Sequence, residues 1–266
     1  MIAELTTLEP GIHAGIPSDR YHSLPHLSAS MLKKLRRSPA HLRYSMDHPQ
    51  PDTEALAFGR LLHSMILEPD QVESQYVFAP KLDKRTKEGK AAWEALQSDG
   101  RQVVSVEDRD KAAAMVAALR NDSGIASILW DCEGSNELTY LWSDDGLDCR
   151  ARIDRVCEWR GMRCFVDYKT TQDASPDGFP YEARRHGYGI QCAHYLNGDR
   201  ALTDAERPTF IFIAQEKEPP YMPALAVVED EFVELHEPIV RGLVEQYRVC
   251  LSDNYWPGYG TFSLTK

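Results

Sequence analysis

The sequence contains no pair of cysteines spaced as CxxC, although it has six cysteines in 266 residues. Zinc sites and iron–sulfur clusters commonly use such pairs, so their absence argues against a structural metal cluster. A chain of this length can also bury a sizeable core without disulfide bonds. We therefore predict that the cysteines are free thiols, buried as small hydrophobic side chains.

Long apolar segments are missing as well. No run approaches the roughly 18 to 20 residues needed to span a bilayer. The N-terminal segment MIAELTTLEP lacks the basic-then-apolar pattern of a secretory signal. We expect a cytoplasmic protein.

Basic residues are in the minority, with 30 Lys and Arg against 41 Asp and Glu, which gives a formal net charge of -11. This balance argues against a protein that coats nucleic acid non-specifically, because phosphate binding requires local positive charge. It does not exclude a nuclease, since the metal site of such an enzyme itself requires carboxylates.

Internal repeats, low-complexity tracts and long linkers are absent, so we expect one domain over residues 1–266. Residues 22–130 are predicted to be mainly helical, with helices at 28–37, from 52 or 53 to 67, and at 111–120. Ser105 and Asp108 resemble a capping box before the last of these helices. Residues 80–90 are polar and basic, typical of a loop or a frayed helix start.

The hydrophobic period changes after residue 134, where a catalytic core is predicted over residues 134–250. Three strands are expected to form an antiparallel meander, and a helix, two strands and a final helix follow. Their ranges are 137–142, 147–156 and 162–169 for the meander, then 190–196, 209–214, 224–228 and 230–251. The fold class is therefore α/β, with a central mixed sheet flanked by helices.

Two aspartates should meet on neighbouring strands of the meander. A turn at Arg160-Gly161 would place Asp154 opposite Asp167, with Cα atoms about 4.5 to 5.5 Å apart. Strand alternation puts Lys169 on the same face as Asp167. An Asp and a Lys at this spacing are often only an exposed ion pair, but the apolar lead-in Cys164–Val166 indicates a central strand.

Two ionised carboxylates at that distance repel each other unless a cation lies between them. Carboxylate and carbonyl oxygens suit Mg²⁺, and Mn²⁺ as a substitute. The backbone carbonyl of Tyr168 is a candidate further ligand. Lys169 would then lie beside a metal-bound water, where it could orient the nucleophile or stabilise charge on a phosphoryl oxygen.

Together, these motifs resemble the PD-(D/E)xK nuclease superfamily. The matching segments are GRLLHSMILEP with His63, RARIDRV with Asp154, FVDYKTT with Asp167 and Lys169, and QCAHY with Gln191 and Tyr195. The sequence is most similar to the RecE-type exonuclease VIII nuclease domain, and more distantly to RecB nuclease and lambda exonuclease. The resemblance covers about residues 22–250.

The resemblance implies a Mg²⁺-dependent exonuclease that degrades linear double-stranded DNA from 5′ to 3′ and leaves 3′ single-stranded overhangs for recombination and repair. By motif match, Asp154 and Asp167 would be metal ligands, Lys169 the catalytic lysine, and His63 a further ligand. The resemblance also implies a bacterial or phage origin, a ring-shaped homo-oligomer (tetramer or trimer) and a single-strand annealing partner.

Further residues are expected around this site. Glu137, at the start of the meander, could contribute to a second metal, although an exposed glutamate is the usual case there. By resemblance, Gln191 and Tyr195 would line the site and contact DNA. Candidates for phosphate contacts are Arg150, Arg152, Arg184, Arg185, Lys81, Lys84, Arg85, Lys87 and Lys90.

Two other functions stay open. The first is a Cas4-like or endonucleolytic member of the superfamily, and the missing cysteine quartet argues against its iron–sulfur form. The second is a non-catalytic module that binds DNA ends, against which the presence of both aspartates and the lysine speaks.

Overall fold

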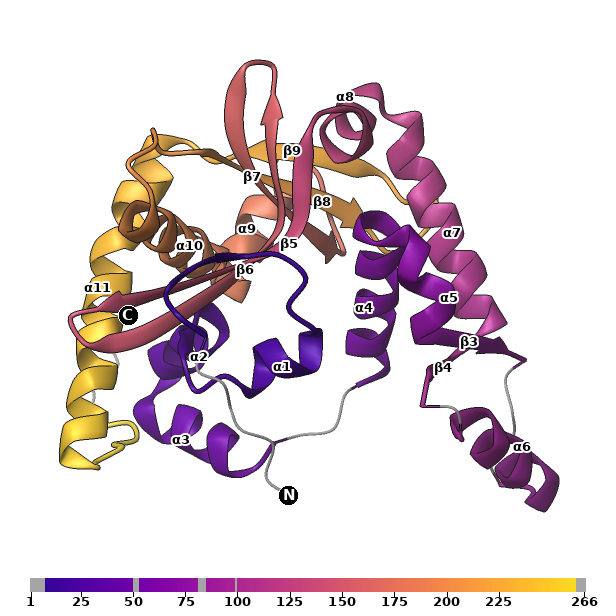
Figure 1. The fold of residues 1–266 in the computed structure, drawn as a ribbon, viewed down its shortest axis with the longest axis horizontal. Helices are drawn as coiled ribbons and strands as arrows, with labels where there is room; N and C mark the ends of the chain where they lie inside the picture. Colours follow the sequence, from indigo (N-terminus) through magenta and orange to yellow (C-terminus); the bar gives the residue numbers. More distant parts are fainter. Residues whose placement is uncertain (1–7, 50–52, 81–84, 99, 262–266) are drawn as a thin grey trace.

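The computed structural model describes residues 8–49, 53–80, 85–98 and 100–261. Its centre is a seven-stranded sheet with the order β1-β5-β6-β7-β8-β9, and β2 pairs with β6 (Figure 1). The strands are β1 (Gly11–His13), β2 (Leu27–Ser28), β5 (Gly134–Asp144), β6 (Leu147–Trp159), β7 (Met162–Thr171), β8 (Thr209–Glu216) and β9 (Pro223–Val227).

The sheet is mixed, as predicted. β5, β6 and β7 form the expected antiparallel meander, β8 runs parallel to β7, and β9 is antiparallel to β8. A parallel pair requires a crossover connection, and here the chain between β7 and β8 forms α9 (Gly178–His186) and α10 (Tyr188–Leu202).

Helices cover both faces of the sheet, each over its own hydrophobic core. On one face, α2 (Ala29–Arg37), α10 and α11 (Asp230–Asp253) pack over residues such as Phe165 and Phe210. On the other face, α4 (Glu54–Leu67), α7 (Val106–Asn121) and α8 (Ser123–Ala126) cover residues such as Val166 and Ile211. Burial of both faces explains the nearly continuous apolar sequence of β8.

Local sequence signals account for where the main helices begin. The Thr53 side chain accepts a hydrogen bond from the backbone N–H of Leu56 at 3.2 Å and caps α4. The Ser105 hydroxyl accepts one from Asp108 N–H at 3.0 Å and caps α7. Both starts agree with the sequence prediction.

Side-chain alternation breaks once in β6. Ala151 and Ile153 belong to the core beneath α10, whereas Cys157 and Trp159, at odd positions too, belong to the core beneath α4. In a regular strand these four side chains would share one face. The alternation of side chains between the two faces of the sheet therefore shifts by one residue between Ile153 and Cys157, in the segment that contains Asp154.

The neighbouring strand β5 has a matching irregularity. Glu137 has a φ of 54°, in the left-handed region that side chains other than glycine seldom adopt. It lies between Asn136, which pairs with Arg155, and Leu138, which pairs with Ile153. Continuing that register places Glu137 opposite Asp154, at a rung where the ladder is interrupted.

Several short elements were not predicted. A two-stranded parallel sheet joins β3 (Tyr76–Ala79) to β4 (Gln102–Ser105), and α6 (Lys87–Gln97) projects beside it in Figure 1. Lys81 and Lys84 lie outside the described residues. The other short elements are α1 (Ser18–Ser23), α3 (Pro39–Asp47), η1 (Pro69–Gln71), α5 (Val72–Gln75) and the π-helical turn η2 (Ser127–Asp131).

All six cysteines are free, and five of them are buried, as expected from the sequence. Cys132 is partly exposed.

Among the described residues, no helix combines the length and the apolar character needed to cross a bilayer. The single-domain organisation stays a prediction.

Candidate active site

Asp154 of β6 lies between the sheet and α4. Its Oδ2 accepts a hydrogen bond from the backbone N–H of Tyr168 at 2.9 Å and lies 3.6 Å from Nδ1 of His63. The His63 ring packs edge-on against the Tyr168 ring, with centroids 5.5 Å apart. Strand β7 and helix α4 therefore both hold the Asp154 carboxylate in place.

The pKa of Asp154 is raised from its ordinary value. Burial is the main cause, and the neighbouring Asp167 carboxylate adds to it, while His63, Lys169 and the Tyr168 N–H oppose the shift. A carboxylate in such a place gains from a nearby cation, because the cation compensates for lost hydration and for the second negative charge.

Glu137 of β5 joins this site through its unusual backbone conformation. Burial, together with the nearby Asp154 carboxylate, raises the pKa of Glu137 to about 8, although Arg152 opposes the shift. The Arg152 Nε lies 3.8 Å from the Glu137 carboxylate. Donor atoms of His63, Glu137 and Asp154 all lie within 4.8 Å of one another.

This donor set fits a divalent metal ion. Two carboxylates and one imidazole match the ligands that Mg²⁺ and Mn²⁺ accept, and Mn²⁺ tolerates the imidazole nitrogen better. Burial and neighbouring carboxylates raise the pKa values of Asp154 and Glu137, so a bound cation would stabilise the ionised form of both carboxylates. When bound, such an ion supplies Lewis-acid polarisation of a phosphoryl oxygen.

Asp167 of β7 directly follows Val166, the last residue of β7 that pairs with β6. Arg155 pairs with Val166, so the same register extended by one residue sets Asp154 opposite Asp167, although the ladder stops before that rung. Asp167 is 1% exposed and is absent from the group of close donor atoms. The structure thus brings His63, Glu137 and Asp154 together and directs Asp167 to other partners.

Those partners are Gln191 and Lys169. The Asp167 Oδ1 accepts a hydrogen bond from Gln191 Nε2 at 2.5 Å, and its Oδ2 forms an ion pair with Lys169 Nζ. Among the described residues, the same Oδ2 has no hydrogen-bond partner besides this ion pair, so it could accept one more contact. Burial lowers the pKa of Lys169, but Asp167 and Asp154 outweigh burial and raise it overall.

Gln191 and Tyr195 lie one turn apart on α10, as the sequence indicates. Gln191 Nε2 lies 3.3 Å from the Tyr195 hydroxyl. Both are buried, at 6% and 9% exposure. In this conformation they line the inner wall of the site. A direct contact with DNA stays a prediction for both.

Lys33 of α2 was not among the sequence candidates. Its Nζ donates a hydrogen bond to Gln191 Oε1 at 2.9 Å and lies 5.1 Å from the centre of the Tyr188 ring. Burial, together with the nearby Lys169 ammonium group, lowers the pKa of Lys33 to about 7, although Asp167 opposes the shift. The basic segment KKLRR gave no signal that distinguished Lys33 from its exposed neighbours.

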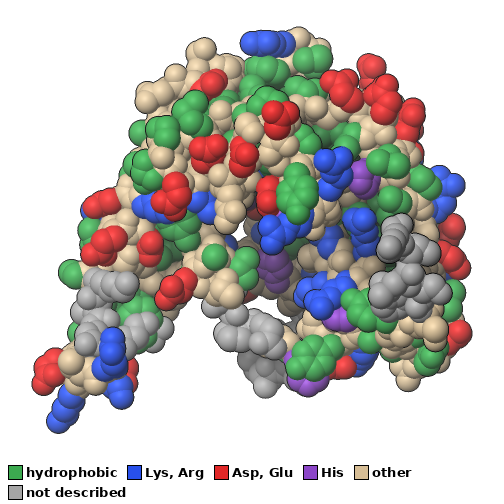
Figure 2. Space-filling view, turned by 180° about the vertical axis from the view of Figure 1, so that it is seen from behind, with side chains coloured by type: hydrophobic (Ala, Val, Ile, Leu, Met, Phe, Trp, Pro, Cys, Tyr) green, Lys and Arg blue, Asp and Glu red, His purple; other side chains and the backbone are tan. Residues whose placement is uncertain are grey.

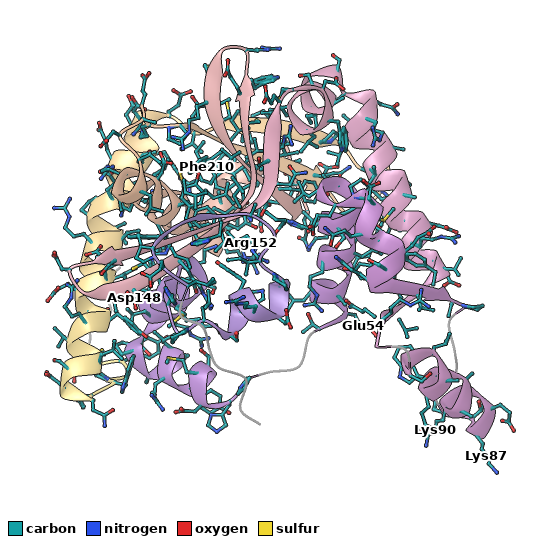
Figure 3. All side chains as sticks on the ribbon, viewed as in Figure 1. Glu54, Lys87, Lys90, Asp148, Arg152 and Phe210 are labelled. Atoms are coloured by element: carbon teal, nitrogen blue, oxygen red, sulfur yellow. The ribbon has the colours of Figure 1, made fainter. Side chains whose placement is uncertain are left out.

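Two of the arginines expected to contact phosphate have other partners. Arg150 is 7% exposed and donates to the backbone carbonyls of Tyr21 and Leu24, so the expectation for Arg150 is wrong in this conformation. Arg152 donates to the carbonyl of Ile16 at 2.6 Å and approaches Glu137. Both arginines attach the N-terminal segment to the sheet, and Figure 3 shows Arg152 at the centre of the molecule.

The other described basic candidates are exposed. Arg184 and Arg185 lie on α9, where Arg185 is 3.6 Å from the Glu182 carboxylate. Lys87 and Lys90 lie on α6, and Figure 3 shows them pointing away from the body of the protein. The carbonyl of Tyr168 stays a predicted ligand, on the residue whose N–H donates to Asp154.

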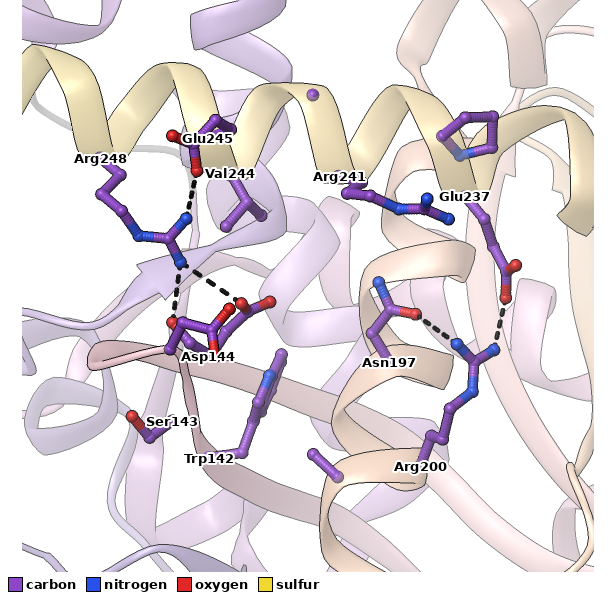
Figure 4. Close-up of a pocket in the computed structure, with 14 residues that line it drawn as sticks. Trp142, Ser143, Asp144, Asn197, Arg200, Glu237, Arg241, Val244, Glu245 and Arg248 are labelled. Atoms are coloured by element: carbon purple, nitrogen blue, oxygen red, sulfur yellow. Dashed lines mark hydrogen bonds and ion pairs between the residues drawn. The ribbon is translucent and has the colours of Figure 1, made fainter.

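The described part of the chain is hollowed in more than one place. Figure 2 shows a hollow between two lobes in which basic and histidine side chains gather. A separate groove of about 830 Å³ lies between α10, α11 and the end of β5 (Figure 4). Its arginines Arg200 and Arg248 are paired with Glu237 and Glu245, and none of the close donor residues lines it.

Comparison with known proteins identifies the family of the chain. A family model described as a PDDEXK-like domain of unknown function (DUF3799) matches residues 28–264. The chain belongs to this PDDEXK-like family. Membership supports a nuclease, and nucleases of this kind are typically dependent on divalent metal ions.

One solved structure supports the same fold. The chain is similar to a crystal structure from Eubacterium rectale described as "Putative exonuclease", with a TM-score of 0.63 and 14% identity over 92% of this chain and 90% of that one. A structure named SSO0001 has 17% identity over 87% and 81% of the two chains, but its TM-score of 0.37 is too low to support an argument. Among curated proteins, no sequence matches.

Proposed function

We propose that this PDDEXK-like protein is a Mg²⁺-dependent exodeoxyribonuclease that degrades linear double-stranded DNA, with Mn²⁺ able to replace Mg²⁺. The observation that supports this most strongly is the convergence of His63, Glu137 and Asp154 donor atoms within 4.8 Å, beside the ion pair of Asp167 and Lys169. Donor atoms of the kind that bind a cation thus lie close to the partly buried ammonium group of Lys169.

The residues divide the chemistry between them. Glu137, Asp154 and His63 would hold the divalent ion, and the free capacity of Asp167 Oδ2 makes it a further candidate ligand. Lys169 keeps its proton because Asp167 and Asp154 raise its pKa. Its ammonium group would therefore stabilise the negative charge that develops on a phosphoryl oxygen and orient the attacking water.

DNA binding by an acidic protein requires local positive charge at the site. We propose that a bound divalent ion and the exposed Arg184 and Arg185 of α9 supply it, since a few local charges can outweigh a net charge of -11 at short range. Digestion from 5′ to 3′, leaving 3′ overhangs for recombination and repair, is part of the proposal. So are a ring-shaped homo-oligomer and a single-strand annealing partner.

A cleavage assay tests the proposal. Linear duplex labelled at its 5′ ends and covalently closed circles are incubated with Mg²⁺ or with EDTA. We expect Mg²⁺-dependent loss of the linear DNA with the circles intact. Nicked circles would favour the endonucleolytic alternative, and retention of linear DNA without cleavage would favour a DNA-end-binding module.

A pair of variants links the activity to the site. Asp154→Asn removes one negative ligand and should abolish cleavage. Asp148→Asn changes an exposed aspartate of the same strand, which Figure 3 places away from Arg152, and should cleave like the original protein. Equal activity of both variants would contradict the assignment.

A further inference from the structure

The Lys33 side chain packs against a second helix, whereas a surface lysine of a helix usually extends into solvent. Its side chain leaves α2 and reaches Gly187, next to the start of α10. If Gly187 were alanine, its Cβ would lie 3.3 Å from Lys33 Cγ. Gly187 also has a φ of 65°, at the junction of α9 and α10. The missing side chain at Gly187 leaves room for the aliphatic part of Lys33.

A series of contacts leads from the Lys33 ammonium group into the site. Its Nζ donates to Gln191 Oε1 at 2.9 Å, and Gln191 Nε2 donates to Asp167 Oδ1 at 2.5 Å. Asp167 in turn forms the ion pair with Lys169. Helix α2, which lies more than a hundred residues before β7 in the chain, is thereby connected to β7.

The chemistry of the two end groups determines the orientation of the amide between them. An ammonium group can only donate hydrogen bonds, and an ionised carboxylate can only accept them. The Gln191 amide therefore has a single orientation that satisfies both, with its oxygen towards Lys33 and its NH₂ group towards Asp167. Without Lys33, the amide oxygen would be buried without a partner, and rotation towards other contacts would cost less.

We propose that Lys33 is a positioning residue, which fixes the Gln191 amide so that it holds the Asp167 carboxylate in the orientation that pairs with Lys169. The proposal rests on the proposed nuclease function. It assigns Lys33 a role through Gln191 and not a direct contact with the substrate. Partners of this kind typically contribute about 10- to 100-fold to the activity of a site.

Kinetics on linear duplex DNA with Mg²⁺ provide the first test. We expect Lys33→Met to lower kcat roughly 10-fold with KM unchanged within about twofold, and Lys33→Arg, which keeps a donor, to recover most of the loss. Lys34→Met is the matched control, because Lys34 is the exposed neighbour on the same helix, and it should behave like the original protein. A raised KM with unchanged kcat for Lys33→Met would overturn the proposal, since it would indicate a direct DNA contact.

A double-mutant comparison tests the route through Gln191. If Lys33 acts through Gln191, then Lys33→Met should add no further loss of kcat to a Gln191→Leu protein. Independent losses that multiply would show that Lys33 acts by another route.

A second measurement does not depend on catalysis. In ¹⁵N-labelled protein without metal, the side-chain NH₂ signal of Gln191 is identified by its loss in Gln191→Leu. We expect slow hydrogen exchange of this group in the original protein and in Lys34→Met, and fast exchange in Lys33→Met. Unchanged exchange in Lys33→Met refutes the positioning role, whereas absence of cleavage by the original protein refutes the nuclease function and leaves this measurement decisive for Lys33.

Discussion

His194 provides a measurable link between the fold and pH. It lies on α10 at 1% exposure, where its Nε2–H donates to the carbonyl of Arg150 at 3.1 Å and its ring contacts Trp142. Burial lowers the pKa of His194 to about 4, from 6.5 for the free side chain, although carbonyls of Arg150 and Leu27 oppose the shift. The folded protein therefore holds a neutral imidazole at neutral pH.

The sign of the effect follows from proton binding. Between pH 6.5 and 4 the unfolded chain binds a proton at His194 that the folded protein excludes, so the free energy of unfolding falls as the pH falls. The contribution of His194 is fully present above pH 6.5 and is lost towards pH 4. One pKa unit corresponds to about 1.4 kcal/mol, so lowering the pH from about 7.5 to about 5 should cost roughly 2 kcal/mol through this residue.

Urea denaturation at the two pH values measures this cost. Other groups titrate over the same range, so the comparison is between proteins. We expect the loss of unfolding free energy in His194→Gln to be roughly 2 kcal/mol smaller than in the original protein, because glutamine has no proton to gain. Equal losses in the two proteins would refute the buried neutral imidazole.

Three further predictions concern the site and the packing around it. Glu137→Gln should weaken Mn²⁺ binding about 10- to 100-fold in calorimetric titration, because one charged ligand is lost, and an unchanged affinity would exclude Glu137 from the site. Lys169→Met should retain Mn²⁺ affinity but lower the cleavage rate roughly 100- to 1000-fold, and a rate within threefold of the original would contradict its role in stabilising charge. Gly198→Ala would place a Cβ 2.7 Å from the Trp142 ring and should lower the unfolding free energy by about 1 to 3 kcal/mol in urea denaturation, whereas unchanged stability would show that the ring moves freely.

The sequence was sufficient to predict the meander and its register. The turn at Arg160-Gly161 determines which residues of β6 and β7 face each other, and the structure pairs Arg155 with Val166 accordingly. Local signals such as the Thr53 cap also located α4 and hence the turn that bears His63. These features depend on neighbouring residues, which a sequence pattern records.

Other features depend on contacts between distant segments. The strands β1 and β2 have three and two residues and pair with β5 and β6, more than a hundred residues away, so their own patterns are too short to identify them. The burial of Lys33 arises from the packing of α2 on α10. The left-handed conformation of Glu137, which brings it beside Asp154, has no signal in a non-glycine residue.

The interrupted rung between β5 and β6 has a consequence for local opening. Missing ladder bonds at Glu137 reduce the number of hydrogen bonds that must break before this edge of the site separates, while the flanking rungs stay fully paired. This rung, beside the donor atoms of His63, Glu137 and Asp154, therefore has fewer hydrogen bonds to break than the paired rungs on either side. We expect a nuclease that binds a charged backbone at this site to adapt first at this rung of the sheet.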